Sequence, residues 1–190
     1  MKIQPTDALV VVDVQNDFCH GGALPVPQGH RVVPIINQLA PKFDQAAFTR
    51  DWHPANHCSF SEPPEFVDGS WPVHCLADSP GAEFHGDLHV PSDAIIINKG
   101  TDPDKENYSG FDATPLADEL RRRRVERIFV CGLATDYCVK QTALDGLKHG
   151  FAVFLVENAC RGIGTPESIT ASVEEMKRAG IKVCWSGDLE

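Results

Sequence analysis

The stretch Arg127–Glu157, RIFVCGLATDYCVKQTALDGLKHGFAVFLVE, decides the fold that this sequence predicts. It begins with an apolar run typical of a strand buried on both faces, and it continues through a turn into helical spacing of apolar residues. After Gly150, a second β-branched and apolar run begins. A strand, a helix and a second strand in this order predict parallel pairing with a right-handed crossover.

The same alternation extends over the rest of the chain. The last helix has the clearest limits, because Thr165 can cap its first turn, Pro166 suits its first position and Gly180 its end. We expect one three-layer α/β domain over residues 1–190, with a mostly parallel sheet of about six strands and helices on both faces. The predicted strands are Ala8–Val14, Gln45–Thr49, Ala94–Asn98, Arg127–Gly132, Ala152–Glu157 and Ile181–Trp185, and the predicted helices are Arg31–Ala40, Pro115–Arg123, Asp136–His149 and Pro166–Ala179.

Size and charge narrow the classes of protein to consider. A chain of 190 residues with 42% hydrophobic residues suits one domain with a sizeable core. The net charge of -10 should repel nucleic acid and anionic membranes, and the basic run Arg121–Arg124 lies where cations complement a helix end. We therefore expect a small-molecule partner, with no nucleic acid and no membrane. A homo-oligomer remains open.

We expect a cytoplasmic protein with reduced thiols. No apolar stretch reaches the length of about 18 residues that a membrane helix needs, and Met1–Pro5 lacks the apolar core of a signal peptide. The seven cysteines are an odd number with no C-x-x-C pair, which predicts neither a disulfide framework nor a zinc ribbon.

The stretch at about 52–92 departs from the alternation of strands and helices. It is rich in Pro, His, Gly and Asp, and at about 40 residues it is several times longer than a usual connection. Long loops of this kind are either functional or disordered, and the aromatic content favours an ordered loop. The aromatic residues are Trp52, Phe60, Phe66, Trp71 and Phe84.

Four reactive side chains lie at the ends of predicted strands. Asp13 ends the first strand, Asp51 follows the second, Lys99 ends the third and Cys138 follows the fourth. Because the carboxyl ends of parallel strands meet at one rim, we expect these side chains to converge there. Cys138 also opens a predicted helix, whose unpaired N–H groups and dipole can lower the pKa of a thiol.

A second group of residues predicts a metal site. Asp51 and His53 alternate in an extended segment and can point to the same side, and His74 from the long loop can complete a mixed oxygen and nitrogen set. Such a set suits Zn²⁺, Fe²⁺ or Mn²⁺ better than a thiolate-rich structural site. The spacing alone is a weak signal, so a surface loop rich in histidine stays an alternative.

Five segments spread over nearly the whole chain carry recognisable motifs. The segments are Val12–Cys19 (VDVQNDFC), Asp51–Pro54 (DWHP), Trp71–Cys75 (WPVHC), Asn98–Gly100 (NKG) and Gly132–Val139 (GLATDYCV). Together they resemble the nicotinamidase (pyrazinamidase) branch of the isochorismatase-like cysteine hydrolase superfamily. The Asp, Lys and Cys residues are shared across that superfamily, whereas the Asp-x-His and Trp-Pro-x-His motifs mark the nicotinamidase branch.

The resemblance implies a thiol-based amide hydrolysis. It makes Cys138 the nucleophile, Asp13 the general base and acid, and Lys99 the third catalytic residue. Asp13 would take the thiol proton and later give it to the leaving ammonia, while the Lys99 ammonium would favour the thiolate. The resemblance also implies that the backbone N–H groups of Ala134 and Cys138 bind the oxyanion, with a cis peptide bond between Leu133 and Ala134. Water would then hydrolyse the resulting thioester.

The resemblance further implies how the substrate is chosen. Asp51, His53 and His74 would bind one divalent metal ion, most simply Zn²⁺, and the ion would hold the pyridine nitrogen of nicotinamide. Positioning of this kind can contribute several kcal/mol to lowering the barrier. Phe18, Trp71 and Tyr108 match positions that border the ring, although ordinary loop packing is an alternative for all three.

One position departs from the family pattern. Some relatives carry a third metal-binding histidine where this chain has Ser59, and His57 comes too early to match it. The remaining coordination is therefore left open between water, Ser59, Glu62, Glu65 and His57. Two other functions also stay open, which are a metal-free amidase of the same superfamily acting on a carbamoyl or ureido substrate, and a thiol redox or metal-binding protein.

Overall fold

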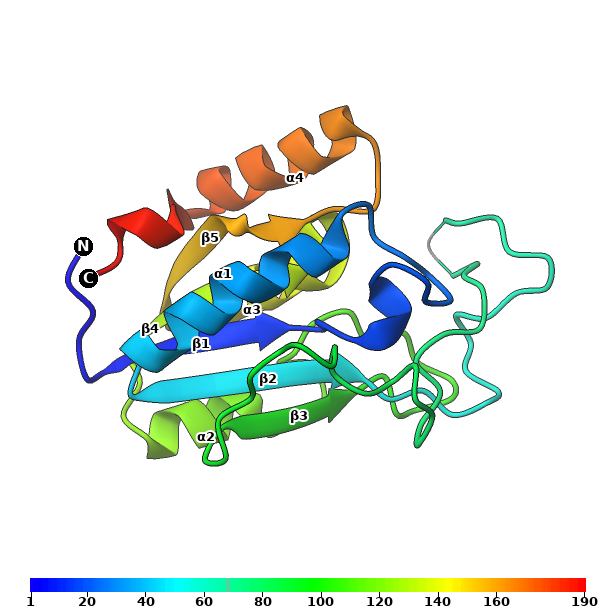
Figure 1. The fold of residues 1–190 in the computed structure, drawn as a ribbon, viewed down its shortest axis with the longest axis horizontal. Helices are drawn as coiled ribbons and strands as arrows, with labels where there is room; N and C mark the ends of the chain where they lie inside the picture. The colour runs from blue at the N-terminus through cyan, green and yellow to red at the C-terminus, as the bar shows by residue number, and fades with distance from the viewer. Residues whose placement is uncertain (68) are drawn as a thin grey trace.

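Six strands form one parallel sheet in the order β3-β2-β1-β4-β5-β6 (Figure 1) in the computed structural model, which describes residues 1–67 and 69–190. The α/β class and the parallel sheet predicted from the sequence are confirmed. The strands are β1 (Asp7–Val12), β2 (Gln45–Asp51), β3 (Ile95–Lys99), β4 (Arg127–Leu133), β5 (Ala152–Arg161) and β6 (Lys182–Cys184).

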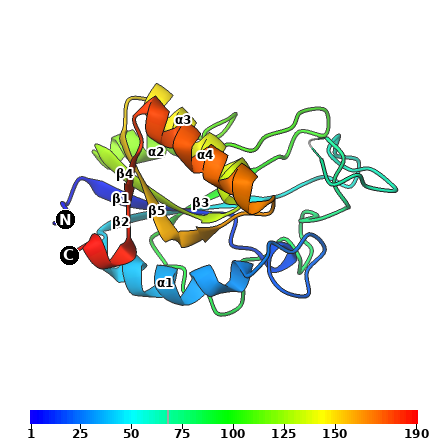
Figure 2. The same cartoon turned by 90° about the horizontal axis from the view of Figure 1, so that it is seen from above.

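Helices cover both faces of the sheet. Figure 2 shows α1 (Val32–Leu39) on one face and α2 (Leu116–Arg122), α3 (Lys140–Lys148) and α4 (Pro166–Ala179) on the other. All six residues of β1 are buried, and so are the last six of the seven in β4. Because helices cover both faces of the sheet, the side chains on both sides of a central strand are buried. This explains the near-continuous apolar runs in these strands.

The strand order reverses between β1 and β4. From β1 the chain builds β2 and β3 toward one edge, and it then returns to place β4, β5 and β6 toward the other edge. Gly132 lets β1 and β4 approach each other closely, because a Cβ atom at this residue would lie 2.1 Å from the Val12 carbonyl oxygen. Ligand sites in open parallel sheets form at the carboxyl ends of the strands beside such a reversal.

Most element boundaries differ by one or two residues from the sequence-based prediction, and three differences have a clear structural cause. β1 ends at Val12, two residues before the predicted limit, because Asp13 turns into the left-handed region with a φ of 50°. The helix predicted at 136–149 begins instead with a π-helical turn, Thr135–Val139, that precedes α3. β5 runs on to Arg161 after a register shift against β4. Such irregularities depend on packing between strands and leave no mark in periodicity.

The long loop between β2 and β3 extends beyond the carboxyl ends of the strands (Figure 1). Its described residues are ordered by isolated bridges that join Gln15 to Phe84, His53 to Leu76 and Phe60 to Trp71. The loop thus returns over the rim at which the reactive side chains were predicted. Within the described part of the chain, no helix has both the length and the apolar character needed to cross a membrane.

Candidate active site

Lys99 is the centre of the cluster at the rim of the sheet. Its ammonium Nζ lies 2.9 Å from Asp13 Oδ2, 2.5 Å from Asp51 Oδ1 and 3.4 Å from Cys138 Sγ. The side chain is only 1% exposed, and Nζ also donates to the Asn107 carbonyl at 3.3 Å. The structure therefore brings together all four residues that the sequence placed at strand ends, with one buried cation between two carboxylates and a thiol.

The two charged partners of the thiol differ in their affinity for a proton. Burial raises the pKa of Asp13, and the opposing effects of Lys99 and of the Thr49 hydroxyl, which donates at 2.6 Å, are smaller. Burial would lower the pKa of Lys99, but the two carboxylates outweigh it and hold this pKa well above its usual range. Lys99 is therefore a fixed cation, and Asp13 is a carboxylate with an increased affinity for a proton.

The Cys138 thiol is not the easily ionised group that its position before a helix predicted. Burial raises its pKa well above the usual range, and the nearby Lys99 ammonium only partly opposes this effect. The side chain is 6% exposed, so desolvation of a thiolate outweighs the favourable helix start. The raised pKa of Cys138 therefore favours the protonated thiol.

The turn that carries Cys138 begins after a cis peptide bond and borders the pocket. The peptide bond between Leu133 and Ala134 is cis, as the resemblance implies, and both Ala134 and Cys138 line the pocket. The π-helical turn is closed by the N–H groups of Tyr137 and Val139, which donate to the Ala134 carbonyl. The backbone between residues 134 and 138 is thus held in place at the edge of the pocket.

The Asp51, His53 and His74 side chains form a set that fits a divalent metal ion. One ligand atom from each lies within 4.8 Å of the other two, and all three residues are buried. His53 Nδ1 lies 2.8 Å from the Gly100 carbonyl and His74 Nδ1 lies 2.8 Å from the Pro72 carbonyl. Each Nδ1–H therefore donates to a carbonyl oxygen, which leaves Nε2 with the lone pair that a metal needs.

One distance and the charges of Asp51 and His74 agree with metal binding at this set. Burial would lower the pKa of His53, but the Asp51 carboxylate raises it above its usual value, so a metal ion would have to displace a proton from that ring. His53 Nε2 and Asp51 Oδ2 are 3.6 Å apart, close to the separation of about 3.4 Å between ligands of a tetrahedral zinc ion. Burial would raise the pKa of Asp51, but Lys99 and His53 hold it well below its usual range, so this carboxylate is ionised. Burial lowers the pKa of His74, which favours the neutral ring that acts as a ligand.

The four side chains considered as further metal ligands differ in exposure and in their contacts. Glu62 and Glu65 are exposed and do not line the pocket. His57 packs its ring 4.1 Å from that of His53, but its two nitrogens already contact Ser59 Oγ and the Lys105 carbonyl. Burial lowers the pKa of His57 to about 4. Of these side chains, Ser59 alone lines the pocket.

Sequence reasoning missed Glu106, which lines the same pocket. Its Oε2 atom is buried with no hydrogen-bond partner in the described part of the chain, while Oε1 accepts from the Asn107 N–H at 3.1 Å. Burial raises its pKa, and the Asp51 carboxylate adds to this effect. A buried polar atom without a partner indicates a ligand or a water that the site accommodates. The polar run 101–107 offers no pattern that could have singled out this glutamate.

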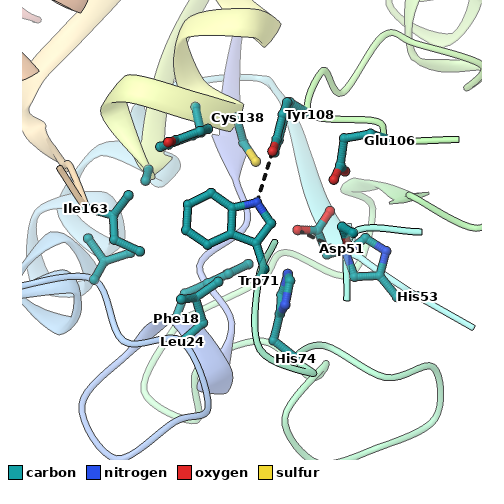
Figure 3. Close-up of a pocket in the computed structure, with 14 residues that line it drawn as sticks. Phe18, Leu24, Asp51, His53, Trp71, His74, Glu106, Tyr108, Cys138 and Ile163 are labelled. Atoms are coloured by element: carbon teal, nitrogen blue, oxygen red, sulfur yellow. Dashed lines mark hydrogen bonds and ion pairs between the residues drawn. The ribbon is translucent and has the colours of Figure 1, made fainter. Parts of the chain in front are cut away.

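Aromatic side chains form the walls between the thiol and the metal-binding set. Phe18, Trp71 and Tyr108 all line the pocket, as the resemblance implies, and Figure 3 shows the Trp71 indole in the centre of the view. Trp71 Nε1 donates to the Tyr108 hydroxyl at 3.0 Å, and the Phe18 ring lies 5.5 Å from that of His74. The sequence did not point to the remaining apolar lining residues, which are Leu24, Val26, Tyr137 and Ile163.

Comparisons with known proteins identify the family of this chain. The family model described as "Isochorismatase domain" matches residues 7–187. The chain is 39% identical to the nicotinamidase of Escherichia coli, over 98% of each chain. It is 36% identical to the nicotinamidase/pyrazinamidase of Mycobacterium tuberculosis, over 94% of this chain and 98% of the relative.

Solved structures give the same result. A pyrazinamidase of Pyrococcus horikoshii in complex with zinc is 50% identical, with a TM-score of 0.88 over 95% of this chain and 99% of that one. PnC1 from L. infantum in complex with nicotinate is 36% identical, with a TM-score of 0.92 over 100% of this chain and 98% of that one. The chain therefore belongs to the isochorismatase family, and within this family of hydrolases it resembles the nicotinamidases and pyrazinamidases.

Proposed function

We propose that this protein is a metal-dependent nicotinamidase that converts nicotinamide to nicotinate and ammonia through a thioester on Cys138. Pyrazinamide, which has the same carboxamide on a related ring, is expected to react in the same way. One observation carries the proposal. A buried thiol beside Lys99 and Asp13 shares one pocket with a buried Asp51, His53 and His74 set, and aromatic walls line the space between them.

The metal site is proposed to hold Zn²⁺, with Fe²⁺ or Mn²⁺ as the other candidates. A bound ion would supply a Lewis acid at one end of the pocket, to which the pyridine nitrogen of the substrate could be directed. Asp51, His53 and His74 would hold it. The choice of zinc is supported by the similar pyrazinamidase of Pyrococcus horikoshii, whose structure was solved in complex with zinc. Glu106 lines the same pocket, and its unpartnered Oε2 atom is proposed to support the metal-binding set through a hydrogen bond when the site is loaded.

The chemical step begins with proton transfer from the thiol to Asp13. The pKa of this carboxyl is raised by burial, so it can accept the proton that the buried Cys138 retains at rest. Lys99, 3.4 Å from Sγ, stabilises the negative sulfur as it forms. Sulfur then attacks the carboxamide carbon, and the backbone N–H groups of Ala134 and Cys138 are proposed to donate to the oxyanion.

Collapse of the tetrahedral intermediate completes the first half of the reaction. Asp13 returns its proton to the departing nitrogen, ammonia leaves, and the acyl group stays on sulfur as a thioester. A water molecule then gives a proton to Asp13 and attacks the thioester carbon. The C–S bond breaks, the acid leaves, and Asp13 returns the proton to the Cys138 sulfur. The Lys99 ammonium keeps its charge throughout, because the two carboxylates hold its pKa well above the usual range.

The alternatives from the sequence are less well supported. A metal-free amidase for carbamoyl or ureido substrates gives no reason for two histidines whose Nδ1 atoms are both anchored to carbonyl oxygens. A thiol redox protein needs a resolving cysteine, whereas the polar groups that face Cys138 Sγ are those of Lys99 and Asp13. The cytoplasmic location and the absence of nucleic-acid and membrane partners stay predictions from composition.

Ammonia release tests the proposal directly. Zinc-loaded protein is incubated with nicotinamide, pyrazinamide and a ureido compound, before and after removal of the metal by a chelator. We expect ammonia from the two ring amides, loss after chelation and recovery when metal is restored. Release from the ureido compound alone would contradict the proposed substrate while leaving a hydrolase in place.

A further inference from the structure

The carboxylate of Asp136 joins two segments that border the pocket. Asp136 belongs to the π-helical turn Thr135–Val139 that carries Cys138, and its side chain reaches the loop between β5 and α4. Oδ1 accepts from the Ile163 N–H at 3.0 Å, and Oδ2 accepts from the Gly164 N–H at 2.9 Å. The residue is 8% exposed, so water screens these bonds little.

The loop is shaped to receive this carboxylate. Glycines flank Ile163 on both sides, and a Cβ atom at Gly164 would lie 2.6 Å from Asp136 Oδ2. A Cβ atom at Gly162 would lie 3.0 Å from Oδ1 and 2.4 Å from the Ile169 side chain. A side chain at either position would push the loop backbone away from the Asp136 carboxylate. This part of the loop therefore requires glycine at both positions.

Ile163 is the side chain that this loop presents to the pocket. It is half-buried and lines the same cavity as Cys138, Trp71 and the metal-binding set. In Figure 3, Ile163 and the Asp51, His53 and His74 group lie on opposite sides of the Trp71 indole. Because Ile163 lines the same cavity as Cys138 and Trp71, a substrate ring bound in this cavity would have Ile163 as part of its wall.

We propose that Asp136 is a positioning residue, which fixes Ile163 against the substrate by holding the N–H groups of Ile163 and Gly164. The inference rests on the proposed nicotinamidase function for its kinetic consequence, but the clamp itself is a property of the fold. Asp136 acts through Ile163 and does not touch the reacting atoms. Its loss weakens contacts made equally in the ground state and the transition state, so it raises KM and leaves kcat nearly unchanged.

Steady-state kinetics with nicotinamide test this proposal through paired variants. Asp136→Asn keeps the volume of the side chain but replaces one acceptor oxygen with an NH₂ group that cannot accept from an N–H. We expect KM to rise roughly tenfold, which is the effect of losing apolar contact with one to two methylene groups. The value of kcat should stay within about a factor of two of the wild-type value. Ile163→Ala should raise KM similarly. In the Ile163→Ala background, Asp136→Asn should add less than about a twofold increase, because both changes remove the same contact.

The alternative role for Asp136 is to hold the thiol, because it lies two residues from Cys138. The rate of Cys138 alkylation by iodoacetamide separates the two roles. Under the proposal, Asp136→Asn alkylates at the wild-type rate. A fall in kcat accompanied by slower alkylation would overturn the proposal, and so would additive KM effects in the double variant.

Amide hydrogen exchange tests the clamp without any substrate. The N–H groups of Ile163 and Gly164 should exchange slowly in the wild-type protein and at least about tenfold faster in Asp136→Asn. Equal exchange in both proteins overturns the clamp, whatever the enzyme hydrolyses. If the wild type shows protected amides but releases no ammonia from nicotinamide, the clamp stands and the proposed substrate fails.

Gly164→Ala provides a second route if Asp136→Asn does not fold. Its Cβ would collide with both Asp136 Oδ2 and the Ser168 hydroxyl, which moves the loop while leaving the carboxylate intact. We expect the same rise in KM at unchanged kcat, with faster exchange at Ile163. Gly187→Ala, where nothing lies within 4 Å of the added atom, is the matched control and should leave KM and kcat unchanged. Wild-type KM in Gly164→Ala would overturn the proposal.

Discussion

Replacement of Lys99 by methionine should destabilise the fold as well as abolish activity, because the ammonium separates two buried carboxylates. At an effective dielectric constant of about 20, the attraction between Nζ and Asp13 at 2.9 Å is about 6 kcal/mol. Desolvation of the ammonium offsets much of this attraction, so removal of the cation alone should cost about 3–5 kcal/mol. For a domain of this size the unfolding midpoint should fall by roughly 6–20 °C.

Differential scanning calorimetry of the metal-free protein measures this change, since a metal ion would compensate the charge of Asp51. Lys177→Met is the matched control, because Lys177 forms an ion pair with Glu174 on the surface. Surface ion pairs contribute little to stability, so the unfolding midpoint of this variant should equal that of the wild type. The double variant Lys99→Met/Asp13→Asn should recover part of the lost stability, because it removes one of the two uncompensated carboxylates. An unchanged midpoint in Lys99→Met, or a double variant less stable than Lys99→Met alone, would refute the electrostatic reasoning.

Three further outcomes follow from the site. Cys138→Ala should release no ammonia from nicotinamide, whereas mass spectrometry of quenched wild-type enzyme should detect an acyl adduct on this cysteine. Glu106→Gln should weaken zinc binding by about 10–100-fold in a competition assay with a fluorescent chelator, and Glu65→Gln, at an exposed site outside the pocket, should not. Gly132→Ala should lower the unfolding midpoint by several degrees, because its Cβ would lie 2.1 Å from the Val12 carbonyl oxygen; a midpoint equal to the wild type would contradict the close approach of β1 and β4.

Much of the fold was predictable because it depends on local patterns. Short apolar runs such as Ile128–Cys131 alternate with helical spacing, and parallel strands buried on both faces are the arrangement that satisfies both patterns. The boundaries were less predictable. Asp13 leaves β1 through a left-handed φ of 50°, and the π-helical turn before α3 arises where the chain meets the pocket. Local propensity does not describe either feature.

The candidate site also contains residues that the sequence could predict and residues that it could not. Residues at the ends of strands, such as Asp13, Asp51 and Lys99, could be placed at one rim because the topology of a parallel sheet places them there. Glu106 could not be predicted, since a loop brings it to the pocket from a polar segment without periodicity. The sequence also could not show that Glu62 and Glu65 lie outside the pocket, because the path of the long loop depends on its own packing.

The sequence by itself determined the order of strands and helices, the residue types at the rim and the family to which the chain belongs, because these properties depend on chain pattern and side-chain identity. Only the tertiary structure decided the direction in which the pKa of the Cys138 thiol is shifted, because burial raises this pKa where a helix start alone would lower it. It also decided that Lys99 bridges both carboxylates and that Asp136 reaches the loop of Ile163. Desolvation and contacts between distant segments exist only after the chain has folded.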